Sequence, residues 1–434
     1  MATYPESAGG TAFVSTITGF AGFLDTLDNA LISANNLNRR MGLLFIDLSH
    51  VNMLNTRVGY RKVSEILDGV HSILSDIKRP SDLLERIDEN RFALILSDIK
   101  FPAVVDLAVN KVHENLDGLR GLTGLETTIY PKTGVALYPD HGKTAEELLL
   151  EADTAAQAAH ISGSSVMRAG SDECQKINQI KMIESEFEAA FMSSEFELFY
   201  QPKVDIANRE IYGAEALIRW KHKELGKINP ELLVQVIERG PLLQDVTLWT
   251  LNTALNQSNA MREKCPGFKV AVNLSPGLLA SPDLVALVLQ SLKTWDTPHD
   301  CLILEVTETA MIADHVAAIE NLRKLSEAGI ILSIDDFGTG YSSYSYLQHF
   351  PVNELKIDKS FIQTLLTDAS SEKLVSSMIA LGKDFGVSVL AEGIESVEVL
   401  DRLVDLGCEY GQGFLIARPL PIDEMIAWLD KPDW

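Results

Sequence analysis

The chain has 434 residues, about two to three times the usual length of one domain, so we expect two domains. Its formal net charge of −24 excludes a nucleic-acid polymer as a general partner, because such partners need a basic surface. Hydrophobic residues make up 46% and charged residues 23% of the chain, which excludes a disordered protein. No apolar run approaches ~18 residues, so we expect no membrane span.

The N-terminal residues 1–13 lack the basic and apolar regions of a signal peptide. Four cysteines are scattered along the chain without the spacing of metal ligands. In a chain of this size such cysteines indicate reduced thiols. We therefore expect a cytoplasmic protein.

The first part of the chain, residues 1–165, alternates helical stretches with short apolar runs at 42–49, 91–98 and 132–139. This alternation predicts an α/β sandwich built on one sheet. The following residues, 166–180, overlap a Gly- and Ser-rich stretch and are predicted to form a linker. A helix is then predicted from apolar residues at helical spacing, namely Ile177, Ile180, Ile183, Phe187, Ala190 and Phe191.

The second domain, residues 181–434, contains eight strand-like apolar runs. They span residues 198–205, 213–220, 268–275, 302–309, 330–337, 354–361, 388–395 and 411–418. Stretches long enough for a helix separate most of them, which predicts a TIM-like (β/α)8 barrel. The gap after the first run, residues 206–212, is too short for a helix, so we expect an irregular start to the barrel.

Most of these runs carry a polar residue at or near the end of an apolar segment. The residues are Glu215, Asn273, Glu305, Asp335, Asp336, Lys356, Glu392 and Gln412. In a parallel barrel the carboxyl ends of the strands meet on one face, where active sites lie. Any single one of them is more simply explained as a local cap or pair. The whole set, in step with the strand period, indicates a shared site.

Several carboxylates in one place need a counter-cation or raised pKa values. Ligation by Glu, Asn and Asp oxygens, without Cys or His, favours hard cations such as Mg²⁺ or Mn²⁺. The adjacent Asp335 and Asp336 could serve two ions, as in two-metal phosphoryl chemistry.

The second domain resembles the EAL domain, the cyclic di-GMP phosphodiesterase module. The resemblance covers nearly all of residues 195–425 and rests on eight ordered motifs. They are YQPKVD (200–205), EALIRW (215–220), NLSP (273–276), LEVTET (304–309), DDFGTGYSS (335–343), LKIDKSFI (355–362), AEGIES (391–396) and GQGFLIARPLP (411–421). Eight motifs in order are far more specific than one short pattern.

The resemblance implies a role for each matching residue. The implied metal ligands are Glu215, Asn273, Glu305, Asp335 and Asp336, with one or two Mg²⁺ or Mn²⁺ ions bound. Lys356 is implied to contact the attacking water, and Glu392 to act as general base or metal-site partner. Gln412 would complete the site, and Glu308 would anchor the 335–343 loop. The implied substrate-binding residues are Gln201, Arg219, Gln412 and Asp358.

The activity implied is hydrolysis of cyclic di-GMP to linear pGpG. Because EAL domains often pair, a homodimer through this domain is also implied. Two alternatives stay open: a non-catalytic receptor for cyclic di-GMP, and an interaction scaffold with a vestigial site. The other class of cyclic di-GMP phosphodiesterase needs a His-Asp metal motif; the one His-Asp pair of this chain, His299-Asp300, stands alone and does not form that motif.

Residues 40–165 resemble a GGDEF (diguanylate cyclase) domain through residues 43–60 and 133–153. The signature itself is degenerate, because Asp88-Glu89-Asn90-Arg91-Phe92 stands in its place. Arg91 replaces an acidic metal ligand, and Ser49 and Ser64 stand where aspartates are usual, whereas Asp47 and Asn55 are retained. The resemblance therefore implies a domain without cyclase activity.

A possible inhibitory site lies just before the degenerate signature. Arg79 and Asp82 match the RxxD product-binding motif of the same family. The motif is short, so a local ion pair or turn is the alternative.

Overall fold

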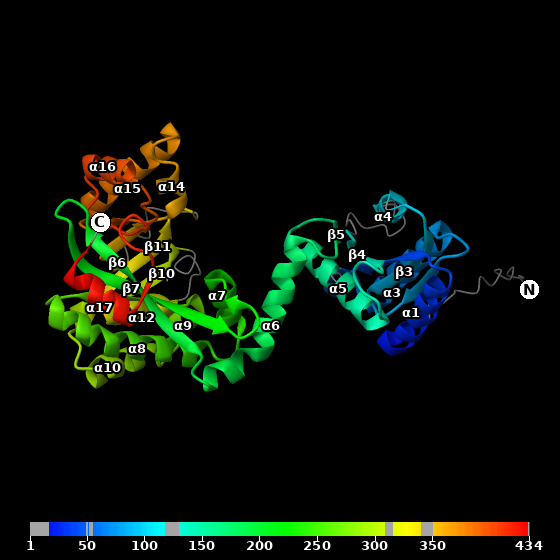
Figure 1. Ribbon diagram of the computed structural model, residues 1–434, viewed down its shortest axis with the longest axis horizontal. Coiled ribbons are helices and arrows are strands. Elements are labelled where there is room, and N and C mark those ends of the chain that lie inside the picture. Colours follow the sequence, from blue (N-terminus) through cyan, green and yellow to red (C-terminus); the bar gives the residue numbers. More distant parts are fainter. Residues whose placement is uncertain are drawn as a thin grey trace, which may run out of the picture. The chain divides into compact units, whose positions relative to one another are not determined.

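The computed structural model describes residues 17–48, 51, 55–101, 103–117, 130–308, 316–339, 350–432 and 434 (Figure 1). It divides into two compact units, Met1–Met182 and Ile183–Trp434. Ser49, Thr309 and residues 340–343, which belong to motifs named above, lie outside the described residues.

The first unit is an α/β sandwich on one five-stranded sheet, as predicted. The strands are β1 (Arg40–Asp47), β2 (Leu83–Arg86), β3 (Arg91–Ile99), β4 (Lys132–Tyr138) and β5 (Val166–Arg168), in the order β2-β3-β1-β4-β5. The helices are α1 (Gly19–Asn36), α2 (Asn55–Val58), α3 (Tyr60–Ile77), α4 (Ala103–Asp117) and α5 (Ala145–Ile161). The three apolar runs predicted as strands are the three longest strands, β1, β3 and β4.

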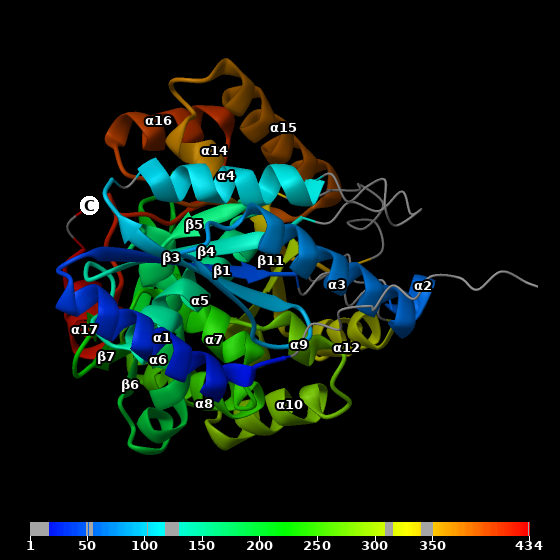
Figure 2. The ribbon, with the colours of Figure 1, turned by 90° about the vertical axis from the view of Figure 1, so that its right-hand side faces the viewer.

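Alternate residues of β1 pack into two separate cores. Leu44 and Ile46 are buried together with residues of α3 and α4, whereas Leu43 and Phe45 are buried with residues of α1 and α5. Successive side chains of a strand point to opposite faces, so an apolar run without polar alternation requires helices on both faces. Figure 2 shows α4 and α1 on opposite sides of β1 and β3.

The segment 166–180 is not the irregular linker suggested by its composition. Residues 166–168 form strand β5, which pairs in parallel with β4, and Asp172–Met192 form the helix α6. Cys174 and Ile177 are buried against Ala155 and Ala158 of α5. The Gly and Ser residues near β5 suggested a linker. However, the pairing of β5 with β4 and the burial of one face of α6 against α5 order the segment. The predicted helix that enters the second domain is α6.

Gly134 in β4 lies where α5 approaches the sheet most closely. A Cβ built on Gly134 would lie 1.9 Å from the carbonyl oxygen of Ala152 and 2.4 Å from the amide nitrogen of Ala156. Both atoms belong to the helix backbone, which cannot rotate away as a side chain can. The glycine therefore sets the distance between the sheet and α5.

Gly134→Ala is expected to destabilise the first unit by about 3 kcal/mol or more, because overpacking against backbone displaces a whole element. Hydrogen–deuterium exchange of the β4 amides in the full chain measures the loss. Gly22→Ala is the control, since its new Cβ would meet only the Cγ2 atom of Thr18, at 2.9 Å. Equal protection of β4 in the two variants would contradict this account of Gly134.

The second unit is a closed barrel of eight strands, which confirms the predicted fold class. The strands run in the order β6-β14-β13-β12-β11-β10-β9-β7, and β6 also pairs with β7 to close the ring. Their bounds are β6 (Phe196–Asp205), β7 (Glu210–His222), β9 (Lys269–Asn273), β10 (Leu302–Thr307), β11 (Ile331–Phe337), β12 (Glu354–Ile357), β13 (Ser388–Ala391) and β14 (Tyr410–Gly411). Two short strands, β8 (Gly226–Lys227) and β15 (Leu420–Pro421), extend the sheet.

Helices follow most of the strands and cover the outside of the barrel (Figure 1). They are α7 (Pro230–Arg239), α8 (Leu243–Lys264), α9 (Pro276–Leu279), α10 (Leu284–Thr294), a 3-10 helix (His299–Cys301), α12 (Val316–Glu327), α14 (Lys359–Gln363), α15 (Ala369–Phe385), α16 (Val397–Leu406) and α17 (Ile422–Asp430). The strands from β7 to β14 pair in parallel around the ring, so their carboxyl ends open on one face.

The barrel differs from a fully parallel ring at its start, where an irregularity was expected. Strand β6 is antiparallel to both of its neighbours, β7 and β14. The short connection at 206–209 forces this hairpin, because a parallel crossover needs about a dozen residues or more. Glu215 consequently lies in the middle of the 13-residue strand β7, not at its end.

The predicted strand at 411–418 is wrong for most of its length, since only Tyr410–Gly411 forms β14. A Cβ on Gly413 would lie 2.2 Å from the carbonyl oxygen of Ile394. The chain therefore passes directly against the segment that follows β13 and turns there, so it does not continue as a strand. The apolar residues after Gly413 produced the strand signal, but they do not belong to a ladder.

Candidate active site

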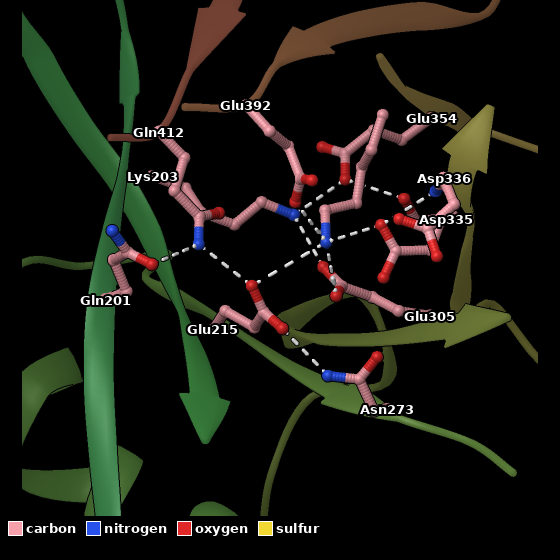
Figure 3. A network of polar contacts seen from close by, with 12 residues as sticks. Gln201, Lys203, Glu215, Asn273, Glu305, Asp335, Asp336, Glu354, Glu392 and Gln412 are labelled. Carbon is pink, nitrogen blue, oxygen red and sulfur yellow. Dashed lines mark hydrogen bonds and ion pairs between the residues drawn. The ribbon is translucent and has the colours of Figure 1, made fainter. Parts of the chain in front are cut away.

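Lys356 lies at the centre of a cluster of carboxylates inside the barrel. Its Nζ atom is 2.8 Å from Glu305 Oε2, 2.8 Å from Glu392 Oε1, 2.9 Å from Asp335 Oδ1 and 3.6 Å from Glu215 Oε2. Figure 3 shows the four carboxylates turned toward one region. The lysine comes from β12, and the acids come from β7, β10, β11 and the residue after β13.

Strand register brings these residues to one level. Glu305 of β10 is paired with Asn273 of β9, and Gln201 of β6 is paired with Glu215 of β7. Asp335 is paired with Thr307, two residues beyond Glu305. Neighbouring strands of a barrel are staggered, so residues that are far apart in the chain form layers inside it.

Glu215 is held from two sides by amide groups. The Nδ2 of Asn273 donates to Glu215 Oε1 at 2.7 Å, and the Nε2 of Gln412 donates to Glu215 Oε2 at 2.8 Å. Gln412 Nε2 also donates to Gln201 Oε1 at 2.9 Å. Burial, followed by repulsion from Glu305, raises the pKa of Glu215 above its ordinary value.

The charge of the cluster is only partly balanced. Burial by itself would lower the pKa of Lys356, but Asp335, Glu215, Glu305 and Glu392 raise it well above the ordinary value. Burial raises the pKa of Glu392 to about 8, although Lys356 opposes this rise. Repulsion from Asp335 and Glu215 adds to the rise caused by burial, and a bound cation would oppose both effects.

Glu305 is the exception among these acids. Its burial alone would raise the pKa, but the ammonium groups of Lys356 and Lys203 lower it to about 2. Glu305 is therefore ionised at neutral pH.

Asp335, Asp336 and Glu392 offer carboxylate oxygens that lie within 4.8 Å of one another. Asp336 adopts a φ of 54°, a left-handed conformation that is uncommon outside glycine and is tolerated best by Asn and Asp. Its amide nitrogen donates to Asp335 Oδ1 at 3.0 Å. The backbone turn thus directs two consecutive carboxylates into the same site.

The residues present fit a hard divalent cation. The donors are carboxylate and amide oxygens, with no Cys or His in the set. Among the described residues, Gln412 Oε1 is buried without a hydrogen-bond partner. Buried polar atoms are normally paired, so this oxygen is free to accept a further donor, such as a water molecule bound in the site.

A cavity of about 540 Å³ opens beside the cluster. Its wall includes Glu215, Arg219, Asn273, Glu305, Asp335, Asp336 and Glu392. The Nη1 atom of Arg219 donates to the carbonyl oxygen of Ile218 at 2.9 Å, and its guanidinium lies 5.8 Å from the centre of the Phe199 ring. A cation in the wall of an acidic cavity suits an anionic ligand.

Three of the residues predicted to bind substrate make other contacts. Gln201 and Gln412 are buried and bind each other and, through Gln412, Glu215. The Oδ1 of Asp358 accepts from the amide of Ser360 at 3.0 Å and so caps α14. Direct substrate contacts by these three residues stay predictions.

Glu308 contacts the start of the 335–343 loop. Its Oε2 atom accepts a hydrogen bond from the amide of Gly338 at 2.9 Å. Gly338 has a φ of 100° and lies two residues after Asp336. Glu308 therefore ties the start of the 335–343 loop to the end of β10.

The sequence analysis missed four polar residues that lie deeper in the barrel, namely Lys203, Tyr212, Ser333 and Glu354. Lys203 Nζ donates to Glu305 Oε1 at 3.0 Å and to Glu354 Oε1 at 2.7 Å. Strand alternation could have found three of them, because Lys203, Ser333 and Glu354 lie two residues from Gln201, Asp335 and Lys356.

In the first unit, Arg91 of the degenerate signature points at Asp47, the acid retained in β1. Its Nε atom is 3.7 Å from Asp47 Oδ2 and 3.6 Å from Asp88 Oδ2. None of the described residues 87–91 has a positive φ, so this hairpin does not use the turn that glycines would form.

Arg79 and Asp82 bind each other. The Nε and Nη2 atoms of Arg79 each donate to one oxygen of Asp82, both at 2.8 Å. Asp82 Oδ1 also accepts from the amide of Ser97 at 3.1 Å. These contacts correspond to the local ion pair named as the alternative, and ligand binding at this motif stays a prediction.

Two protein families match the chain. The EAL domain matches residues 184–419, and the diguanylate cyclase, GGDEF domain matches residues 16–165. No helix in the described part of the chain has the length and apolar character to span a membrane.

Curated relatives align with nearly the whole chain. The bifunctional diguanylate cyclase/cyclic di-GMP phosphodiesterase MucR of Pseudomonas aeruginosa is 33% identical over 93% of this chain and 59% of its own length. The cyclic di-GMP phosphodiesterase NbdA of Pseudomonas aeruginosa is 29% identical over 92% of this chain and 51% of its own length. The chain thus spans about half to three fifths of these relatives.

Solved structures align with more than half of the chain. The PaMucR phosphodiesterase in complex with c-di-GMP is 37% identical, has a TM-score of 0.54, and covers 56% of this chain and 99% of its own. The EAL enzyme Bd1971, in its cAMP and cyclic-di-GMP bound form, is 33% identical with a TM-score of 0.55, covering 59% of this chain and 70% of its own. The chain therefore belongs to the EAL domain family, and a GGDEF domain precedes its EAL domain.

Proposed function

We propose that the barrel hydrolyses cyclic di-GMP to linear pGpG and that the reaction depends on Mg²⁺ or Mn²⁺. The observation that carries this proposal is the carboxylate cluster around Lys356, which opens into a cavity with Arg219 in its wall. Relatives named as cyclic di-GMP phosphodiesterases and the c-di-GMP complex of PaMucR support the choice of substrate.

The residues that would hold a first ion are Glu215, Asn273, Glu305 and Asp335, and Asp335 and Asp336 would serve a second beside Glu392. When bound, such ions stabilise negative charge on phosphate oxygens and lower the pKa of water. Glu392, whose Oε1 atom lies 2.8 Å from Lys356 Nζ, would act beside these ions as the group that accepts a proton.

The remaining roles follow from charge and position. Hydrolysis adds the hydroxyl of water to phosphorus and breaks the bond to the ribose 3′ oxygen, which takes up a proton. Lys356 would hold the attacking water through its ammonium group, and Arg219 would bind a non-bridging phosphate oxygen. Positive groups placed where charge develops lower the barrier to reaction.

One assay separates this function from the alternatives. The full chain is incubated with cyclic di-GMP and Mg²⁺, and the nucleotides are separated by chromatography. We expect pGpG, and no turnover after chelation of the metal. Unchanged nucleotide bound to the protein would indicate a receptor, and absence of both binding and turnover would indicate a scaffold.

We also propose that the GGDEF domain has no cyclase activity and acts in regulation. The guanidinium of Arg91 faces Asp47 and Asp88, and a cation in this position disfavours binding of Mg²⁺. Incubation of the full chain with GTP and Mg²⁺ should yield no cyclic di-GMP or pGpG. A homodimer through the barrel and a cytoplasmic location stay predictions.

Glu308→Ala is expected to lower the hydrolytic rate about tenfold to a hundredfold at limiting Mg²⁺, because partners of metal ligands contribute to affinity at this level. The variant loses the contact with the Gly338 amide but keeps every implied ligand, so excess Mg²⁺ should restore the rate. Glu308→Gln is the control, since its side-chain oxygen can still accept that hydrogen bond. A rate that does not respond to added metal would contradict this role.

A further inference from the structure

Lys203 is a fully buried charge that the proposed chemistry does not use. It lies in β6, and its side chain has 0% exposure. Its Nζ atom donates to Glu305 Oε1 at 3.0 Å and to Glu354 Oε1 at 2.7 Å (Figure 3). An uncompensated ammonium at this depth would be strongly destabilising, so the two acids must account for its presence.

Glu354 supplies the charge that balances Lys203. Its other contacts are neutral donors: the hydroxyl of Ser333 donates to Oε1 at 2.9 Å, and the hydroxyl of Tyr212 donates to Oε2 at 2.8 Å. The Lys203–Glu354 pair is therefore neutral as a unit, with the polar atoms of the acid satisfied. Neither Lys203 nor Glu354 lines the cavity.

The two carboxylate oxygens of Glu305 accept hydrogen bonds from two different lysines. Lys203 binds Oε1 from the deeper side, and Lys356 binds Oε2 at 2.8 Å on the side of Asp335 and Glu392. The contact with Lys203 thus determines which oxygen faces the other carboxylates. A carboxylate whose two oxygens are both held by hydrogen bonds has little freedom to rotate.

We propose that Lys203, neutralised by Glu354, is a positioning residue that holds Oε1 of Glu305 and directs Oε2 toward the divalent cation. The inference rests on the proposed function, in which Glu305 is a metal ligand. Hydrogen bonds from residues behind a metal ligand orient the ligand, and losing them typically weakens metal binding about tenfold to a hundredfold.

Mn²⁺ binding to the full chain, measured by calorimetry without nucleotide, tests this role directly. Lys203→Met keeps the length and apolar stem of the side chain but removes the donor, and should weaken Mn²⁺ binding about tenfold to a hundredfold. Lys324→Met is the matched control, because Lys324 forms an exposed pair with Glu320 on α12. Mn²⁺ affinity in Lys203→Met equal to or tighter than that of the parent would overturn the proposal.

A double variant separates positioning from charge compensation. Lys203→Met alone leaves Glu354 buried without a cation, so the barrel itself could be damaged. Lys203→Met with Glu354→Gln restores neutrality and keeps an oxygen for Ser333 and an amide near Tyr212. We expect the double variant to recover the thermal stability of the parent while its Mn²⁺ affinity stays low. Recovery of Mn²⁺ affinity together with stability would show that Lys203 only balances Glu354, which overturns the proposal.

The parent chain distinguishes this inference from the proposed function. A parent that binds no Mn²⁺ and hydrolyses no cyclic di-GMP refutes the proposed function and this inference with it. A parent that binds and hydrolyses, beside a Lys203→Met variant with the same Mn²⁺ affinity, refutes the positioning role alone.

Discussion

Lys356→Met is expected to abolish hydrolysis of cyclic di-GMP and to lower the free energy of unfolding of the barrel by roughly 3 kcal/mol. Removing one partner from a buried ionic cluster typically costs about 3–5 kcal/mol, because the remaining charge is left uncompensated. We take the lower end, since Asp335 and Glu392 keep 15% and 18% side-chain exposure and can be hydrated.

Urea unfolding followed by tryptophan fluorescence measures this loss, because all five tryptophans lie in the second unit. A divalent cation can replace the missing ammonium as counter-charge, so Mn²⁺ should stabilise Lys356→Met more than it stabilises the parent. Lys324→Met, which breaks an exposed pair, should behave as the parent does. A variant of parental stability, or one that Mn²⁺ does not stabilise further, would contradict the central place of Lys356.

Glu215→Ala is expected to reduce turnover by roughly 10³-fold, the scale seen when one preorganised group that stabilises charge is removed. The carboxylate of Glu215 accepts hydrogen bonds from Asn273 and Gln412, and it faces both Lys356 and the cavity. The measurement is pGpG formation by purified variant at saturating Mg²⁺. Substantial hydrolysis by this variant would refute the assignment of the site.

Glu215→Gln separates activity from stability. Burial and repulsion from Glu305 raise the pKa of Glu215, so the ionised form is disfavoured in the folded protein relative to the unfolded chain at neutral pH. Removing this charge offsets the loss of one hydrogen-bond acceptor for Asn273 or Gln412, so the free energy of unfolding should stay close to that of the parent while turnover is still lost. A loss of both would indicate that Glu215 has a mainly structural role.

Local sequence patterns predicted most of the barrel. Seven of the eight apolar runs contain a strand of four residues or more, because a buried parallel strand needs a continuous apolar segment. The eighth run failed at Gly413, whose backbone packs against Ile394, a contact 19 residues away that no local pattern records. The linker prediction failed for the same kind of reason, since pairing of β5 with β4 orders residues that look flexible in isolation.

The candidate site divides in a similar way. The acids and Lys356 could be found because each interrupts an apolar run, even though Glu215 lies in the middle of its strand. Lys203 was missed because lysine is usually an exposed residue, and nothing within YQPKVD marks this one as buried. Lys203 lies on the same face of β6 as Gln201, and the pairing of β6 with β7 and β14 turns that face into the ring.

The sequence alone determined which residue types occupy each strand, and hence the barrel, the family and the acidic character of the site. The tertiary structure decided the pairings between residues far apart in the chain: Arg91 with Asp47, and Lys203 with Glu305 and Glu354. The physical reason is the distance along the chain over which each interaction acts. Apolar periodicity is imposed by each segment's own geometry, whereas the partner of a buried charge depends on strand register and closure across more than a hundred residues.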